Sequence, residues 1–427
     1  MTRVLRAVRN SDFATTTFAS MRVRNFRLFF VGQGLSQIGN WMTLVAQTLL
    51  VLHLTDSGVA LGVLAAAQFG PVLLLGPWAG LVADRSDKKR LLMLVQSVSM
   101  VQSLGLAALV FAGTPPVWAV YALASVGGIT IAFDNPARRA FVVEMVDDAR
   151  VANAVGLNTT MMTASRIVGP AAAGLLVATA GFGWAFLVDG LSYVAVLASL
   201  AMIRRSELRP VPQTPKGRGQ VREGLRYVRG EPALFVPLVM MAVVGTLAFN
   251  FSTVLPLFAT RDMGGDDGTY TLLFTVLSVG ALVGALIAAR RATVTVRTVG
   301  WSAVSFGIAL FALALAPGMW AAIPVALVVG AASVGFLTSS TAIVQLEAVA
   351  TMRGRVLALQ AMLFLGSTPI GGPVVGWLSE ELGARAGILV GAAGTLLAGA
   401  WGLAMAARPP AEPTAAEPAL LEAGAAT

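Results

Sequence analysis

The sequence contains no cysteine and one histidine among 427 residues, and only 12% of its residues are charged. Without cysteine, the chain can form neither a disulfide nor a thiolate nucleophile or ligand. The single histidine, His53, has no carboxylate cluster beside it, so we expect no metal and no cofactor. Histidine, cysteine or paired carboxylates spaced for catalysis inside apolar segments are also missing, which argues against an enzyme.

Apolar residues dominate what is present. Hydrophobic residues make up 56% of the chain, and apolar runs of about 20 residues, each long enough to cross a bilayer, recur throughout. The net charge is +9. The basic residues lie between these runs and lack the interleaved aromatic residues of a nucleic-acid surface. The sequence therefore predicts an all-α polytopic membrane protein whose main partner is the lipid bilayer, with no nucleic acid.

Polar and Pro/Gly breaks divide the chain into twelve expected spans. The expected spans are 28–54, 58–82, 91–112, 117–135, 151–179, 183–203, 233–259, 269–289, 298–316, 320–345, 355–379 and 387–407. We group them as an N-terminal segment 1–27, a six-helix bundle 28–203, a linker 204–232, a second six-helix bundle 233–407 and a disordered tail 408–427. All segments outside the two bundles are expected to be cytoplasmic.

The basic residues predict the orientation. The chain has 30 lysines and arginines, and all but Arg166, Arg261 and Arg385 fall in the termini or in loops on one side of the expected spans. The positive-inside rule makes that side cytoplasmic and places both termini there. Within the linker, Val221, Leu225 and Val228 share one face of a possible amphipathic helix at the membrane surface. A solvated hinge is the alternative.

The sequence also repeats internally. Gly76 to Gly80 falls on Gly280 to Gly284 after a shift of about 204 residues, and both stretches read Gly-x-x-x-Gly. Gly169-Pro170 falls on Gly372-Pro373, and each pair is expected to pack or bend a long span. Two six-span copies with the same orientation are typical of secondary transporters. We expect Gly76 and Gly80 to allow another helix to approach closely.

The stretch "GLVADRSDKKR" (80–90) concentrates charge at the end of the second expected span. It resembles the loop 2–3 signature of the major facilitator superfamily, with Gly80, Asp84, Arg85, Lys88 and Lys89 in matching positions. The resemblance implies that these residues form a cytoplasmic latch between the two halves. Asp87 stands where that signature has a second glycine, which predicts an altered turn. A simple positively charged anchor is the alternative.

Other stretches narrow the resemblance. "NFRLFFVGQGLSQIGNWM" (25–42), "FDNPARRAFVVEMV" (133–146) and "ANAVGLNTTMMTASRIVGPAAAGLL" (152–176) are similar to the enterobactin-exporter and macrolide-efflux branch of that superfamily. The resemblance implies an efflux function in a bacterial cytoplasmic (inner) membrane, whereas substrates within the branch differ widely. Residues 166–174, "RIVGPAAAG", also loosely resemble an antiporter signature of the fifth span.

Charged residues inside spans are functional candidates because their burial in a membrane is expensive. Arg166 lies near the middle of the fifth expected span, and its candidate partners are Asp134 and Asp189. A carboxylate that gains and loses an arginine neighbour can load and release a proton, so these three residues are proton-coupling candidates. A fixed structural ion pair between helices is the alternative.

Amide side chains form a second group of candidates. Several recur at helical spacing along the first expected span, and others could join them in a polar cavity, since amides that face lipid would lack partners. The substrate-cavity candidates are Gln33, Gln37, Asn40, Gln47, Gln68, Asn158, Asn250 and Gln360. Hydrogen bonds between helices are the alternative role for these amides.

Together these patterns predict a proton-coupled secondary transporter, a monomer, that exports amphipathic organic molecules such as drugs, antibiotics or siderophore-like compounds. No Gly-x-x-x-x-Gly-Lys-Ser/Thr motif is present, so the energy is expected to come from an ion gradient. An importer or a substrate-specific facilitator of the same fold is the alternative. A receptor or scaffold that transports nothing is a third reading, and the longest expected soluble stretch, of about 30 residues, is too short for a folded domain.

Overall fold

The computed structural model describes residues 17–209, 220–291 and 293–407. Twelve stretches of helix in these ranges are long and apolar enough to cross a membrane, which confirms the all-helical class. The segments 1–16, 210–219 and 408–427 lie outside the described residues, so the expectations for the tail, for the middle of the linker and for most of the N-terminal segment stay predictions.

The first six spans follow one another through short connections. The helices are η1 Ala19–Arg22, α2 Arg24–Thr55, α3 Gly58–Arg85, α4 Lys88–Phe111, α5 Val117–Glu144, η2 Asp148–Arg150, α6 Val151–Ala180, α7 Phe182–Met202 and η3 Arg205–Glu207. Side-chain caps start two of them, because Ser57 accepts from the Ala60 amide and Asp87 accepts from the Arg90 amide. The expected fourth span ended too early, since α5 runs nine residues beyond 135, to Glu144.

The second six spans contain two broken helices. The elements are α8 Gln220–Gly230, α9 Pro232–Ala248, α10 Phe251–Leu257, the π-helical turn η4 Phe258–Asp262, α11 Asp267–Ala289, α12 Val296–Ala314, α13 Met319–Glu347, α14 Ala350–Leu365, α15 Thr368–Leu382 and α16 Ala384–Ala406. The seventh span is thus divided between α9 and α10, and the eleventh between α14 and α15. Helix α8 occupies the place of the expected amphipathic helix in the linker.

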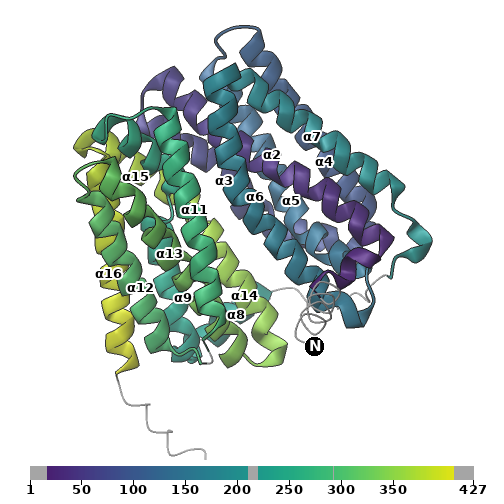
Figure 1. Cartoon of the computed structure of the whole chain (residues 1–427). Helices are drawn as coiled ribbons and strands as arrows, with labels where there is room; N and C mark the ends of the chain where they lie inside the picture. The colour runs from purple at the N-terminus through teal and green to yellow at the C-terminus, as the bar shows by residue number, and fades with distance from the viewer. Residues whose placement is uncertain (1–16, 210–219, 292, 408–427) are drawn as a thin grey trace, which may run out of the picture.

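The internal repeat appears in how the helices pack. Helix α2 packs on α7 as α9 packs on α16, α4 packs on α7 as α12 packs on α16, and α3 packs on α5 as α11 packs on α13. Gly181 and Gly383 join the last two spans of each copy with nearly the same positive φ, 89° and 91°, a conformation that favours glycine. The two copies form the two halves of Figure 1.

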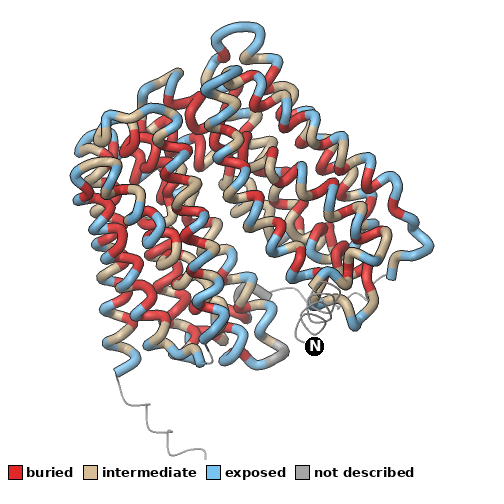
Figure 2. Tube along the Cα trace, in the orientation of Figure 1, coloured by how far each residue is buried: buried red, intermediate tan, exposed pale blue. Residues whose placement is uncertain are grey.

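The halves meet along two helix pairs, α3 with α15 and α6 with α11. Buried residues lie along the inner sides of the helices in both halves, whereas the outward sides carry many exposed positions (Figure 2). Exposed apolar side chains such as Leu74, Trp118 and Leu397 are expected on a surface that lipid covers. The interface between the halves is therefore the place to look for a functional site.

Candidate functional site

Polar contacts between the two halves gather at one end of the molecule, opposite the described N-terminal residues (Figure 1). His53 Nε2 lies 3.1 Å from the Asp267 carboxylate. Glu380 Oε2 accepts from the Ser57 hydroxyl at 2.6 Å and from the Val59 amide at 2.9 Å. Arg261 donates to the carbonyl oxygen and to the carboxylate of Asp56. All of these contacts join the α2–α3 connection and the helix ends beside it to the second half, so this end is closed.

The glycines of α3 show that contact between the two halves is close at one end of this helix and absent at the other. A Cβ on Gly58 would lie 2.5 Å from the Gly376 carbonyl oxygen, and one on Gly62 would lie 2.6 Å from the Gly372 carbonyl oxygen. Helix α3 therefore touches the backbone of α15 near the closed end. A Cβ on Gly76 or Gly80 would meet no described atom within 4 Å. The expectation that Gly76 and Gly80 hold another helix close is wrong for this conformation, because the two halves have separated there.

The charged loop after α3 is bonded to its own half. Lys88 Nζ lies 3.0 Å from the Glu144 carboxylate at the end of α5, and Lys89 donates at 2.8 Å to the Ile203 carbonyl oxygen beyond α7. Asp87 caps α4 with a φ of −63° and pairs with Arg205 at 3.2 Å. This conformation needs no glycine, which explains why aspartate fits where the family signature has one. Arg85 is exposed.

Asp134 has a different partner from the one that its position in the sequence suggested. Its carboxylate lies 2.9 Å from Nε of Arg138, one turn along α5, and it accepts a hydrogen bond from Gln96 Nε2 at 2.8 Å. Arg138 also donates to Asn135 and to the Met162 sulfur. Arg138 was expected in a loop, but the longer α5 buries it. These contacts form a buried polar cluster that joins α4, α5 and α6.

Asp189 forms a second buried cluster, deeper in the first half. Its Oδ2 accepts from the hydroxyls of Thr43 and Ser103, both at 2.6 Å, and the residue is 0% exposed. Its Oδ1 has no hydrogen-bond partner among the described residues. No described lysine or arginine forms an ion pair with Asp189. The arrangement is a carboxylate held by neutral hydroxyls, which differs from the expected pairing with Arg166.

Arg166 forms no ion pair in the described part of the chain. Its guanidinium lies over the ring of Trp41, 5.3 Å from the centroid, and its Nε is buried without a hydrogen-bond partner there. A cation over an indole face is stabilised by the ring quadrupole. Next to it, a Cβ on Gly169 would lie 2.4 Å from the Trp41 Cβ, so α6 approaches α2 closely here.

The amide candidates divide into paired and unpaired groups. Gln68 donates to Gln47 at 2.9 Å, the Tyr193 hydroxyl donates to Asn40 at 2.9 Å, and Gln360 donates to Ser340 at 3.1 Å. Each of these bonds joins two helices. Gln33 is 0% exposed and neither of its amide atoms has a described partner. Gln37 is buried, and Asn158 is partly buried with an unpaired Oδ1.

Asn250 lies at the break between α9 and α10. Its Nδ2 donates at 2.7 Å to the Thr246 carbonyl oxygen, which the interrupted helix leaves available. Its buried Oδ1 has no described partner, and the residue lines a small cavity of about 20 Å³. Phe249 stacks edge-on against Phe364, with ring centroids 5.0 Å apart. The two breaks therefore meet, since Phe249 directly follows α9, Phe364 lies at the end of α14, and α9 also packs on α15.

The two Gly-Pro pairs lie inside α6 and α15, as expected. Gly169 and Pro170 are buried within the first half. Gly372 instead lies against α3 of the other half, since a Cβ added to it would lie 3.1 Å from the Ala65 Cβ. Pro373 contacts the same helix through its Cα, at 2.6 Å from a Cβ on Gly62. The pairs are equivalent in sequence but have different neighbours.

Sequence reasoning missed the residues of the closed end. It considered His53 as a metal ligand and rejected that role, and it assigned no role to Asp56, Arg261, Asp267 or Glu380. One signal was available: Arg261 and Arg385 are the two bases on an otherwise base-poor side. Arg385 donates to the carbonyl oxygens of Ala314 and Ala316, and Arg261 bonds across the halves. Among the described residues, no group of three or more His, Cys, Asp or Glu could hold a metal.

Comparison with known proteins decides the family. The model of the transmembrane secretion effector family matches residues 15–421. The chain belongs to this family. Its relatives are transporters of the major facilitator superfamily, so the resemblance drawn from residues 80–90 is confirmed. The chain is thus a multi-pass membrane protein, and the family and these relatives are transporters and not enzymes.

The chain is 26% identical to the staphyloferrin A transporter of Staphylococcus aureus over 61% of its own length and 66% of that relative's, just under two thirds. It is 23% identical to macrolide efflux protein A of Streptococcus pyogenes over 87% of its own length and 93% of that protein's. A bacterial homologue of the human lysosomal transporter Spinster, solved in an inward-facing and unoccupied conformation, has the same fold. It superposes with a TM-score of 0.71 at 14% identity, over 89% of this chain and 96% of that one.

Proposed function

We propose that this chain is a proton-coupled secondary transporter that exports amphipathic small organic molecules by alternating access. The observation that supports it best is the gradient along α3, where glycines touch α15 at one end and meet no described atom at the other. A pair of bundles bonded at one end and separated at the other is one state of a rocking mechanism. The second state would close the end at Gly76 and Gly80.

The separated end is also the basic end, so we propose that it faces the cytoplasm and that both termini lie there. In that orientation the structure is inward-facing, in a bacterial cytoplasmic membrane. A substrate would enter from the cytoplasm, and the closed contacts at His53, Asp56 and Glu380 would form the outer gate. The chain has no cysteine of its own, so a single introduced thiol reports orientation without background.

The orientation test uses two exposed positions at opposite ends. Glu207→Cys places a thiol at the end of η3, and Thr114→Cys places one between α4 and α5. An impermeant maleimide applied to intact cells should label the second variant and not the first. Labelling of Glu207→Cys in intact cells would overturn the orientation, and with it the assignment of an inward-facing state.

Export rather than import is supported by relatives that are named for macrolide efflux and for staphyloferrin A transport. The interior offers chemistry for an amphipathic molecule: the Arg166 cation over Trp41, unpaired amides, and the aromatic cluster around Phe249 and Phe364. An adaptable apolar surface with a few polar groups suits varied substrates. An importer or a specific facilitator of the same fold is the second candidate. We propose that a monomer suffices, because the two halves complete one interface within one chain.

For the proton site we favour Asp189 over Asp134. Asp134 is neutralised by Arg138, whereas Asp189 is buried among hydroxyls without a described cation. Burial of an isolated carboxylate is expensive unless the group takes up a proton. Asp189 also lies one turn from Tyr193, which bonds to Asn40 on α2. A change in its protonation would therefore be felt by the contact between α2 and α7.

The deciding experiment is efflux in everted membrane vesicles under an imposed pH gradient, with fluorescent dyes and macrolides as substrates. Asp189→Asn should abolish gradient-driven accumulation while leaving substrate exchange, which needs no net proton movement. Asp148→Asn, an exposed acid in η2, is the matched control and should behave as wild type. Gradient-driven transport by Asp189→Asn at the wild-type rate would refute proton coupling through this residue. Accumulation in right-side-out vesicles alone would favour the importer.

A further inference from the structure

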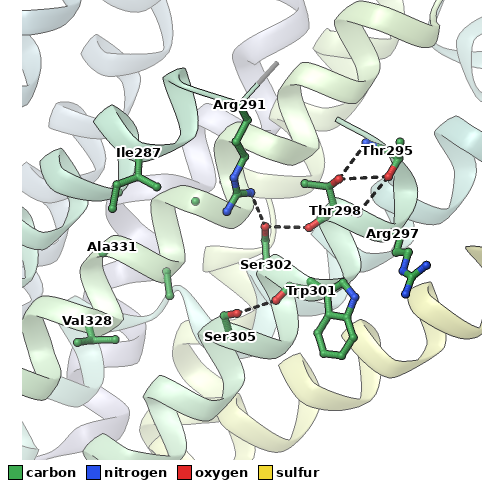
Figure 3. A pocket seen from close by; sticks show the side chains of 13 residues that line it. Ile287, Arg291, Thr295, Arg297, Thr298, Trp301, Ser302, Ser305, Val328 and Ala331 are labelled. Atoms are coloured by element: carbon green, nitrogen blue, oxygen red, sulfur yellow. Dashed lines mark hydrogen bonds between the residues drawn. The ribbon is translucent and has the colours of Figure 1, made fainter. Parts of the chain in front are cut away.

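A groove of about 500 Å³ lies between α11 and α12, with α13 as its floor. It does not belong to the interface between the halves. Figure 3 shows Arg291 reaching toward Ser302, with Ile287, Val328 and Ala331 on one side and Trp301 and Arg297 on the other. The volume lies within the range of small-ligand pockets. The groove therefore has room for a molecule and carries charge at one end.

The groove opens on the outward surface of the second half. Ile287, Trp301 and Val328 line it and are 54%, 52% and 55% exposed. Few side chains fill its floor, because the backbones of α11 and α13 are in contact there. A Cβ on Gly284 would lie 2.1 Å from the Ala331 carbonyl oxygen. Exposed apolar side chains on a membrane-spanning helix face lipid. The apolar part of the groove is therefore open to acyl chains.

Arg291 carries the charge at the inner end of this groove. Its Nη1 donates to the Ser302 hydroxyl at 3.1 Å and to the Ser339 hydroxyl at 3.0 Å. Both serines are buried, so the side chain reaches back toward the bundle. Among the described residues Arg291 forms no ion pair with a carboxylate. Its partners are neutral, and a positive charge remains beside the groove.

A second base stands at the same end. Arg297 lines the groove from the first turn of α12 and is exposed. The free backbone amides at the N-terminus of α12 already have partners, since Thr295 and Thr298 form a reciprocal capping box. The charge that a ligand would meet therefore comes from the two guanidinium groups, each with several donors suited to phosphate oxygens.

We propose that this groove binds one anionic glycerophospholipid, with its phosphate between Arg291 and Arg297 and an acyl chain along Ile287, Trp301 and Val328. The pairing of a basic end with an apolar wall open to lipid fits an amphiphile better than a free anion. Basic pockets between membrane helices on the cytoplasmic side are suited to anionic headgroups. The proposal rests on the proposed orientation, which places this end of the helices at the cytoplasm, and is independent of transport direction and proton coupling.

The test measures lipid retention by the purified full-length chain, using native mass spectrometry with added dioleoyl phosphatidylglycerol or dioleoyl phosphatidylcholine. Wild type should retain one phosphatidylglycerol in preference to phosphatidylcholine. Arg291→Gln should weaken retention by about tenfold, the loss expected for one charge-assisted contact. Arg290→Gln removes the same charge one residue away and outside the groove lining, so it should change retention less than about twofold.

The apolar wall has its own pair of variants. Trp301→Ala should weaken retention by several-fold, while Trp320→Ala, an exposed tryptophan at the start of α13, should leave it unchanged. Arg291→Lys keeps the charge and should retain most of the binding. Circular dichroism and gel filtration of every variant separate lost binding from lost folding.

Three results would overturn the proposal. One is equal loss of retention in Arg291→Gln and Arg290→Gln, which would indicate general surface charge. Another is unchanged retention in a folded Arg291→Gln. The third is displacement of the lipid by inorganic phosphate at the same concentration as a phosphatidylglycerol competitor, which would assign the groove to a free anion.

Discussion

Arg261 in the π-helical turn η4 binds Asp56 across the two halves, at the carbonyl oxygen and at the carboxylate, where the latter contact is 3.1 Å long. Asp56 ends α2 in the left-handed region, with a φ of 44°. Its carboxylate side chain is 83% exposed and that of Arg261 is 34% exposed. The contact therefore joins the halves at the closed end through a partly solvated pair, which suits the outer gate proposed above, since that gate must open.

This relationship gives the first prediction. Arg261→Ala should weaken the closed outer gate by about 1 kcal/mol or less, the range for exposed ion pairs, and shift the conformational equilibrium toward outward-open by up to about fivefold. Spin labels on Thr114→Cys and Pro317→Cys should report a larger population of long distances between the outer loops. The control is Arg290→Ala, which lies at the other end. An unchanged distance distribution in Arg261→Ala would show that the pair contributes nothing to closure.

The glycines of α3 give a second prediction with an internal control. Gly62→Ala adds a methyl group 2.6 Å from backbone atoms of α15, so the outer end cannot close without displacement. Gly76→Ala adds the same group where this conformation has open space. The first variant should favour outward-open molecules. The second should leave the inward-facing state intact and hinder only closure of the inner end.

The same spin-label pair at the outer loops, combined with Glu207→Cys and Arg290→Cys at the inner end, measures both effects. The two alanine variants should move the distance distributions in opposite directions. If they move them the same way, or if neither does, α3 is not the helix along which the halves separate.

A third prediction concerns the buried pair Asp134 and Arg138. Asp134→Asn leaves the Arg138 guanidinium, in a side chain that is 5% exposed, without its carboxylate. Removing one partner of a buried pair destabilises by about 3–5 kcal/mol, whereas replacing both is much less harmful. The double variant Asp134→Asn/Arg138→Gln should therefore be more stable than Asp134→Asn alone. Thermal unfolding in detergent, followed by tryptophan fluorescence, measures this, and additive losses would argue against a coupled pair.

A fourth prediction tests Asp87, the departure from the family signature. Its carboxylate caps α4 by accepting from the Arg90 amide at 3.0 Å. Asp87→Ala should destabilise by about 1 kcal/mol, and Asp87→Gly by only a few tenths, because glycine is tolerated at an N-cap. Thermal unfolding of the two variants compares them directly. A glycine variant less stable than the alanine variant would show that capping α4 is not the main role of Asp87.

Much of the fold was accessible from the sequence because a membrane span has a fixed minimum length and must be apolar. The twelve spans, the repeat and the family could be read from apolar runs, from the recurrence of Gly-Pro and from residues 80–90. Helix ends were harder. Helix α5 continues past the expected boundary and buries Arg138, because Asp134 pairs with it within the same helix. A hydropathy scale scores a charged residue the same whether or not it is paired, so it ended the span too early.

The site depended on tertiary structure. The sequence named Asp134, Asp189 and Arg166 as charges of interest, and it could not choose their neighbours, since each lies near several helices. In the folded chain Asp134 pairs with Arg138, Asp189 accepts from two hydroxyls, and Arg166 lies over the ring of Trp41. The sequence by itself determined which segments enter the membrane, because transfer into lipid depends on composition. Only the packing of α2, α3 and α6 against their neighbours decided which buried charges meet and which end of the molecule is closed, because those contacts join residues far apart in the chain.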